Sequence, residues 1–142
     1  ASFKYPFLMR GRNTVLRRIL LETLWKHGAM NKSEIYQRIM DENRLLKIPT
    51  EHSISSLLHK SCQVVEVGKV VVETESGNRA THTLFDINRD IITTHDELIM
   101  SMPDKLLTAE ESHDVVRCLQ CARRRKVYLD GRCLFCVKSP SD

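Results

Sequence analysis

A helical pattern of apolar positions runs through residues 13–28, NTVLRRILLETLWKHG. Asn13 is suited to capping the N-terminus of this helix, and Gly28 is suited to the left-handed conformation that commonly ends one. The residues that recur at the spacing of one helix face are expected to be buried, namely Leu16, Ile19, Leu20, Thr23 and Leu24. The polar residues off this face are expected to be exposed, namely Arg17, Arg18, Glu22 and Lys26.

Two more helices are predicted before residue 62. The segment that starts at Asn31 has Glu34 three residues on, which is the spacing of a capping box. Its apolar face comprises Ile35, Ile39 and Met40. Pro49 interrupts the chain, and Thr50 is a suitable N-cap for a third helix. The apolar face of that helix comprises Ile54, Leu57, Leu58 and Cys62, so a buried Cys62 is expected.

The pattern then changes to one that is typical of strands. Residues 64–72 and 79–85 are rich in β-branched side chains, and a turn-forming segment, Ser76, Gly77 and Asn78, separates them. We therefore predict a β-hairpin. Three helices followed by a hairpin define an α+β fold class, and this order resembles the winged-helix fold over residues 12–88. Residues 89–117 are mixed in pattern and predict a connector with short helices near 96–102 and from Thr108.

Four cysteines lie close together near the end of the chain. Their spacing is C-x2-C-x11-C-x2-C, formed by Cys118, Cys121, Cys133 and Cys136. Two C-x2-C knuckles can supply the four thiolates of a tetrahedral Zn²⁺ site, and the Asp130-Gly131 turn would bring the second knuckle back to the first. Four cysteine ligands leave no open position, so such a site is structural. Disulfides, a redox pair and an iron–sulfur cluster are the alternatives.

This spacing resembles a zinc ribbon, which the metal would hold folded because the segment has few apolar residues. The predicted plan is a basic N-terminal extension at 1–12, a winged-helix domain at 13–88, a connector at 89–117 and a small C-terminal zinc ribbon at 118–138. Arg123, Arg124, Arg125 and Lys126 are expected on a rigid basic loop between the knuckles.

The net charge of +4 is unevenly distributed. Residues 1–30 carry six basic and one acidic residue, residues 31–114 carry nine and fifteen, and residues 115–142 carry seven and two. Basic ends around an acidic middle favour polyanion binding at the ends. The residues expected to bind nucleic acid are Lys4, Arg10, Arg12, Arg17, Arg18, Arg123, Arg124, Arg125, Lys126 and Arg132. The alternatives are solvated tails, and arginines that only balance the charge of the zinc thiolates.

Several function classes find no support in the sequence. No Gly-rich phosphate loop, nucleophile elbow or defined carboxylate pair is present, so neither an enzyme nor a small-molecule substrate is expected. No run approaches the roughly 18 apolar residues of a membrane span. Base reading typically uses Arg, Lys, Asn or Gln, and the outer face of the third predicted helix carries one Lys and no Arg, Asn or Gln. It carries Glu51, His52, Ser55, Ser56, His59 and Lys60.

Two functional interpretations stay open, with a pure protein-interaction adaptor as a third. The ribbon with its arginines resembles those of ribosomal proteins, which implies a structural role in a ribonucleoprotein, with rRNA and neighbouring proteins as partners. The chain begins without methionine, which would suit a processed protein of the mitochondrial matrix. Alternatively, the domain order resembles the large subunit of transcription initiation factor E, which implies a nuclear DNA-binding protein.

Overall fold

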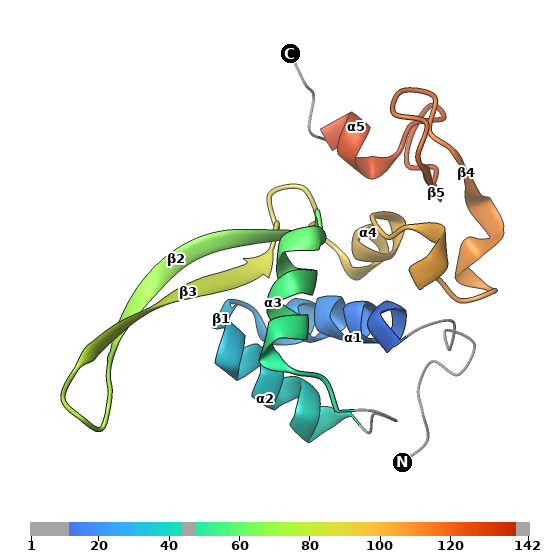
Figure 1. Ribbon diagram of the computed structural model, residues 1–142. Coiled ribbons are helices and arrows are strands. Elements are labelled where there is room, and N and C mark those ends of the chain that lie inside the picture. The colour runs from blue at the N-terminus through green and yellow to red at the C-terminus, as the bar shows by residue number, and fades with distance from the viewer. Residues whose placement is uncertain (1–11, 44–47, 139–142) are drawn as a thin grey trace. The chain divides into compact units, whose positions relative to one another are not determined.

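The computed structural model describes residues 12–43 and 48–138, with side chains described from residue 14 (Figure 1). The chain divides into two compact units. The first contains Leu16–Ile87, and the second contains Asn88–Asp142 together with the first turn of the first helix. Lys4 and Arg10 lie outside the described residues, and Arg12 is described only through its backbone.

Helix α1, Arg12–His27, buries the predicted face. Leu16, Leu20 and Leu24 are almost inaccessible to solvent. Gly28 ends the helix at a φ of +85°, and its amide donates a hydrogen bond of 2.9 Å to the carbonyl of Leu24. Asn13 was expected to cap the helix but lies inside it, because α1 starts at Arg12.

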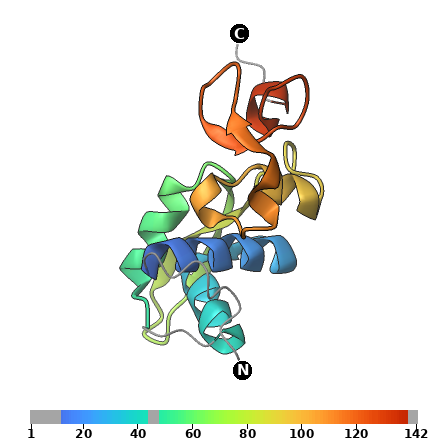
Figure 2. The same ribbon diagram turned by 90° about the vertical axis from the view of Figure 1, so that its right-hand side faces the viewer.

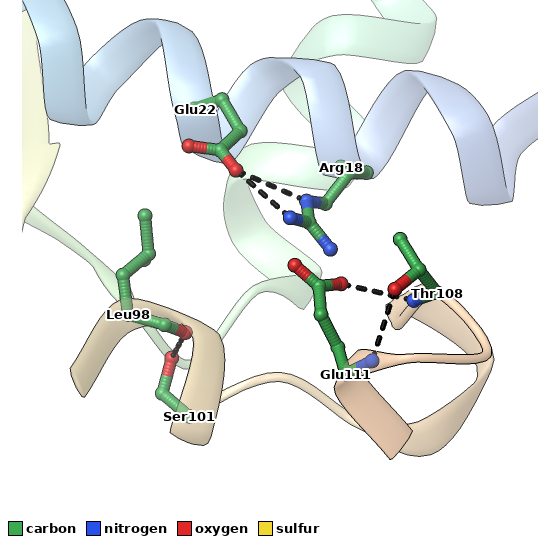
Figure 3. Close-up of polar contacts among 6 residues, drawn as sticks. All are labelled: Arg18, Glu22, Leu98, Ser101, Thr108 and Glu111. Atoms are coloured by element: carbon green, nitrogen blue, oxygen red, sulfur yellow. Dashed lines mark hydrogen bonds and ion pairs between the residues drawn. The ribbon is translucent and has the colours of Figure 1, made fainter. Parts of the chain in front are cut away.

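The expected exposure of Arg18 is wrong. Arg18 retains only 2% of its accessible surface, and its guanidinium forms a 3.0 Å ion pair with Glu22, one helical turn away (Figure 3). Val15 and Leu21 are also buried, so α1 has a second apolar face beyond the predicted stripe, and Arg18 lies on it. Arg17 is half-buried and donates from Nε to Ser61 Oγ at 3.1 Å.

Helices α2, Lys32–Glu42, and α3, Glu51–Lys60, begin at the predicted caps. The Glu34 amide donates to Asn31 Oδ1 at 2.9 Å and the Asn31 amide donates back to Glu34 Oε1 at 3.1 Å, which completes the capping box. Thr50 Oγ1 accepts from the Ser53 amide at 3.1 Å. The apolar faces are buried, except that Met40 is half-buried. Cys62 is exposed, contrary to expectation, because α3 ends at Lys60.

The three-stranded antiparallel sheet of the first unit has the order β1-β3-β2. Strands β2, Val64–Glu73, and β3, Arg79–Ile87, form the predicted hairpin, each extended by one or two residues. Gly77 supplies a φ of +83° in the turn between them. Strand β1, Met30–Asn31, pairs with Leu84 and Phe85 of β3 and was not predicted. The α+β class is confirmed, with helices and hairpin in the expected order.

The second unit contains short elements around its own buried residues. They are α4 (His95–Met100), the 3-10 turns η2 (Asp104–Leu106) and η3 (Glu111–Asp114), β4 (Val115–Arg117), β5 (Arg124–Lys126) and α5 (Leu134–Lys138). Leu98, Met102, Leu106 and Leu134 are fully buried. No α-helix starts at Thr108, contrary to expectation; Thr108 and Glu111 exchange hydrogen bonds of 2.9 and 3.0 Å where the 3-10 turn η3 begins (Figure 3).

Within the described part of the chain, no helix combines the length and the apolar character that crossing a membrane requires.

Candidate metal centre

The first cysteine knuckle is built by backbone hydrogen bonds around Cys118. The Cys118 amide donates to the carbonyl of Arg123 at 2.9 Å, and the Ala122 amide donates to the carbonyl of Cys118 at 2.9 Å. Ala122 adopts a φ of +64°, which turns the chain after Cys121. The amides of Gln120 and Cys121 both donate to Cys118 Sγ at 3.4 Å. The chain therefore folds back around the Cys118 sulfur.

The second knuckle follows the predicted Asp130-Gly131 turn. Both residues have positive φ, 53° and 75°, as a type I′ turn requires, and the Arg132 amide donates to the Leu129 carbonyl at 2.9 Å. The turn delivers Cys133, whose amide donates to Cys118 Sγ at 3.3 Å. Helix α5 then carries the fourth cysteine. It lies beside the β4–β5 hairpin in both views (Figures 1 and 2).

The four sulfurs form one cluster. Each lies within 4.8 Å of the other three. The Cys118 and Cys136 sulfurs are 3.6 Å apart, and those of Cys121 and Cys133 are 3.8 Å apart. A tetrahedron of thiolates about 2.3 Å from a central zinc has edges of about 3.8 Å, so the spacing fits a four-thiolate metal site. Disulfides would need sulfurs about 2.05 Å apart, and all five cysteines are unbridged.

The electrostatics of the cluster favour a bound cation. Burial raises the pKa of the Cys118 thiol, but hydrogen bonds from the amides of Cys121, Cys133 and Gln120 outweigh it and lower this pKa to about 6. Burial and the neighbouring thiols, Cys118 foremost, raise the pKa of Cys136 to about 12. Four thiolates this close repel one another, and a divalent cation would compensate their charge.

The basic residues between the knuckles do not form a loop. Arg124–Lys126 is strand β5, which pairs with β4, so its side chains alternate between two faces. Arg125 retains 7% of its surface and its guanidinium lies 5.1 Å from the centre of the Phe135 ring. Lys126 Nζ donates to the Glu111 carbonyl at 2.7 Å. These two cations hold the unit together, whereas they had been expected to face a ligand.

Three other arginines lie on the outside of the ribbon. Arg117, which the sequence analysis missed, stands directly opposite Arg124 across the β4–β5 pair, and both are exposed. Arg117 Nη1 donates to the Ala122 carbonyl at 3.2 Å, and Arg124 Nη2 lies 3.8 Å from Asp104 Oδ2. Arg123 is exposed beside them, and Arg132 is half-buried at the second knuckle. The sequence feature that could have identified Arg117 is its position directly before Cys118, the first cysteine of the cluster.

Glu97 is a buried carboxylate that no sequence pattern singled out. It retains 8% of its surface and lies on α4. Its Oε1 accepts from the Thr93 amide at 2.8 Å and the Thr93 hydroxyl at 2.6 Å. Its Oε2 accepts from the Tyr128 hydroxyl at 3.0 Å and from Lys138 Nζ at 2.7 Å. Glu97 therefore ties α4 to both ends of the second knuckle.

The outer face of α3 offers little for reading bases. Glu51 accepts from Ser33 at 3.4 Å, and the His59 ring lies edge-on to Phe85 with centroids 6.0 Å apart. Lys60 is the one lysine of α3, which contains no arginine, and it lies at the exposed end of the helix. Comparison of the chain with protein-family models and with curated proteins finds no match.

Proposed function

We propose that this protein is a non-catalytic, RNA-binding component of a ribonucleoprotein, in which a zinc-stabilised ribbon contacts the phosphate backbone. The observation that carries the proposal is the arginine face of the ribbon, formed by Arg117 and Arg124 opposite each other on two strands, with the exposed Arg123 next to Arg124 in the chain. Like charges placed directly opposite each other on two strands destabilise the pair. An arrangement that costs stability in isolation becomes favourable when a polyanion lies across it.

Internal partners do not account for this arginine face. Arg125 stacks on Phe135, and Lys126 and Lys138 are bound to Glu111 and Glu97. By contrast, the Arg124–Asp104 pair is long, with side chains 54% and 45% exposed, and such a pair contributes little stability. The −2 charge of a zinc tetrathiolate centre would be offset in part by these residues, but rigid exposed arginines beside it also suit phosphate contacts.

We propose Zn²⁺ as the metal because all four ligands are thiolates at tetrahedral spacing. Cys118, Cys121, Cys133 and Cys136 would hold it. The ion would supply folding energy and no chemistry, because four cysteines leave no position for water or substrate.

We further propose that the three-helix and hairpin unit docks neighbouring proteins of the complex, as its α3 lacks the side chains of a base reader. The mitochondrial matrix remains our proposed compartment, with the nucleus as the alternative. A DNA-binding transcription factor is the alternative function, and the following experiment separates the two.

Replacing Arg117, Arg123 and Arg124 with alanine is expected to weaken binding of structured RNA and flatten its salt dependence. Each lost phosphate contact lowers the slope of log affinity against log salt by about 0.7 to 0.9, so the slope should fall by about 2. Fluorescence anisotropy across a salt titration measures it, on structured RNA and on duplex DNA. The control replaces Lys26, Lys32 and Lys105, three exposed lysines elsewhere, with alanine and should leave the slope unchanged.

Equal slopes for the arginine variant and the wild type would overturn the polyanion role and favour an adaptor. Tighter binding to particular duplex DNA sequences than to RNA would favour the transcription-factor alternative. All variants must contain equal amounts of metal. A ribbon that had lost its metal and unfolded would also show a weaker salt dependence of binding.

A further inference from the structure

Strand β2 is an edge strand with exposed apolar side chains. Among the described strands, β3 alone pairs with it, so its other edge faces away from the sheet. The outer half of the hairpin extends beyond the three helices (Figure 1). Val71 is 63% exposed and Val72 is 41% exposed. Edge strands of this kind pair readily with another strand unless a bulge, a proline, charged side chains or a covering element protects the edge.

A bulge limits the part of β2 that can pair regularly. The register with β3 shifts between Glu66 and Gly68. From Lys69 to Glu73 the register is unbroken, with Lys69 opposite Thr83 and Glu73 opposite Arg79. Bulges protect edges by twisting them, so the regular segment is 68–73, which consists of Gly68 and the five residues KVVVE.

We propose that this segment pairs with the same segment of a second copy, antiparallel and centred on Val71. The sequence Lys69-Val-Val-Val-Glu73 is complementary to itself in that register. Val71 lies opposite Val71, Val70 lies opposite Val72, and each Lys69 lies opposite the Glu73 of the second copy. Opposite charges and β-branched residues are the cross-strand pairs that stabilise antiparallel sheets. The two hairpins then form one continuous sheet.

The charged ends fit this register and disfavour others. Residues 69, 71 and 73 share a face, so Arg79, Glu73 and the second copy's Lys69 form a ladder of alternating charge. A register centred on Lys69 would place lysine opposite lysine. The register that places Glu66 opposite Lys69 would run across the bulge. The segment carries one positive and one negative residue, so it has no net attraction for a polyanion.

The dimer is expected to be weak and closed. Five residues per strand bury a small area, which is typical of transient interfaces. The self-complementary segment KVVVE occurs once in the chain, so pairing consumes it and stops at two copies. This inference does not rest on the proposed function, although two copies would also join two arginine faces and raise their avidity.

Charge reversal at the two ends tests the register. Sedimentation velocity of the full chain over a concentration series should show the mass rising from monomer towards dimer. Lys69→Glu alone and Glu73→Lys alone each oppose like charges and should remain monomeric over that range. An equimolar mixture of the two variants restores both ion pairs and should dimerise again.

The controls make the same charge changes at exposed positions away from the edge, as Lys32→Glu and Glu110→Lys, and should dimerise like the wild type. Circular dichroism must show an intact fold for Glu73→Lys, which also faces Arg79; Val71→Lys is the substitute if it does not, because it opposes two lysines at the centre. A wild type that stays monomeric to millimolar concentration would overturn the proposal. So would assembly beyond a dimer, or variants that associate like the wild type.

Discussion

Removing the metal is expected to unfold the tetracysteine end of the chain. Residues 115–138 bury few apolar side chains. Zinc binding, with an apparent free energy of about 10–16 kcal/mol in zinc-finger peptides, would therefore supply most of their folding energy. A strong chelator should abolish amide protection in β4, β5 and α5 and leave protection in α2, α3 and the β2–β3 hairpin. Hydrogen exchange measured residue by residue, with elemental analysis of the untreated protein, provides the test. One zinc equivalent per chain is expected.

The chain offers a matched control for this prediction. Cys118→Ser removes a ligand together with the sulfur that accepts three amide hydrogen bonds, so zinc and the ribbon fold should both be lost. Cys62→Ser changes a cysteine outside the cluster and should retain the zinc. A reduced, metal-free protein with full protection in α5 would contradict the prediction. Iron and inorganic sulfide in the purified protein would show that the four cysteines hold an iron–sulfur cluster and not zinc.

The features that could be predicted from the sequence depend on short-range patterns. The capping box of Asn31 and Glu34, the cap at Thr50 and the helix end at Gly28 each involve residues within four positions of each other. The cysteine cluster was predictable for the same reason, since each knuckle is local and the Asp130-Gly131 turn joins them. Local geometry alone places these groups.

The burial and the contacts of individual charged residues could not be predicted, because they depend on partners that are distant in the sequence. Arg125 and Arg124 are neighbours in the sequence, yet one stacks on Phe135 and the other is exposed. Their separation follows from strand alternation, which the sequence analysis missed when it expected a loop. Arg18 was expected in solvent because one apolar face of α1 was recognised and the second was not.

Glu97 is the clearest case of a residue that only the fold reveals. Its partners Tyr128 and Lys138 lie more than 30 residues away in the sequence, and nothing around Glu97 signals them. Replacing Glu97 with alanine should leave Lys138 without its carboxylate and lower the free energy of unfolding of the second unit by about 3 kcal/mol. Denaturant unfolding followed at Tyr128, through hydrogen exchange or NMR, measures the loss. Glu110→Ala, an exposed glutamate of the same unit, should change it by less than about 0.5 kcal/mol.

The pH dependence of the stability that Glu97 contributes follows from the direction in which its pKa is shifted. Burial would raise the pKa of Glu97, but hydrogen bonds from Lys138, Thr93 and Tyr128 outweigh it and lower this pKa from 4.5 to about 2. A carboxyl whose pKa is lower in the folded state stabilises the fold above its unfolded pKa, and that contribution is lost as the pH falls towards the folded pKa. The stability difference between wild type and Glu97→Gln should therefore be constant above about pH 5.5 and fall to about half by pH 3. Protonation of the thiols would release a bound metal as the pH falls, so the two proteins are compared only at pH values where elemental analysis shows that both retain equal amounts of metal. A difference that does not change between pH 6 and pH 3 would show that Glu97 acts through packing and not through its charge.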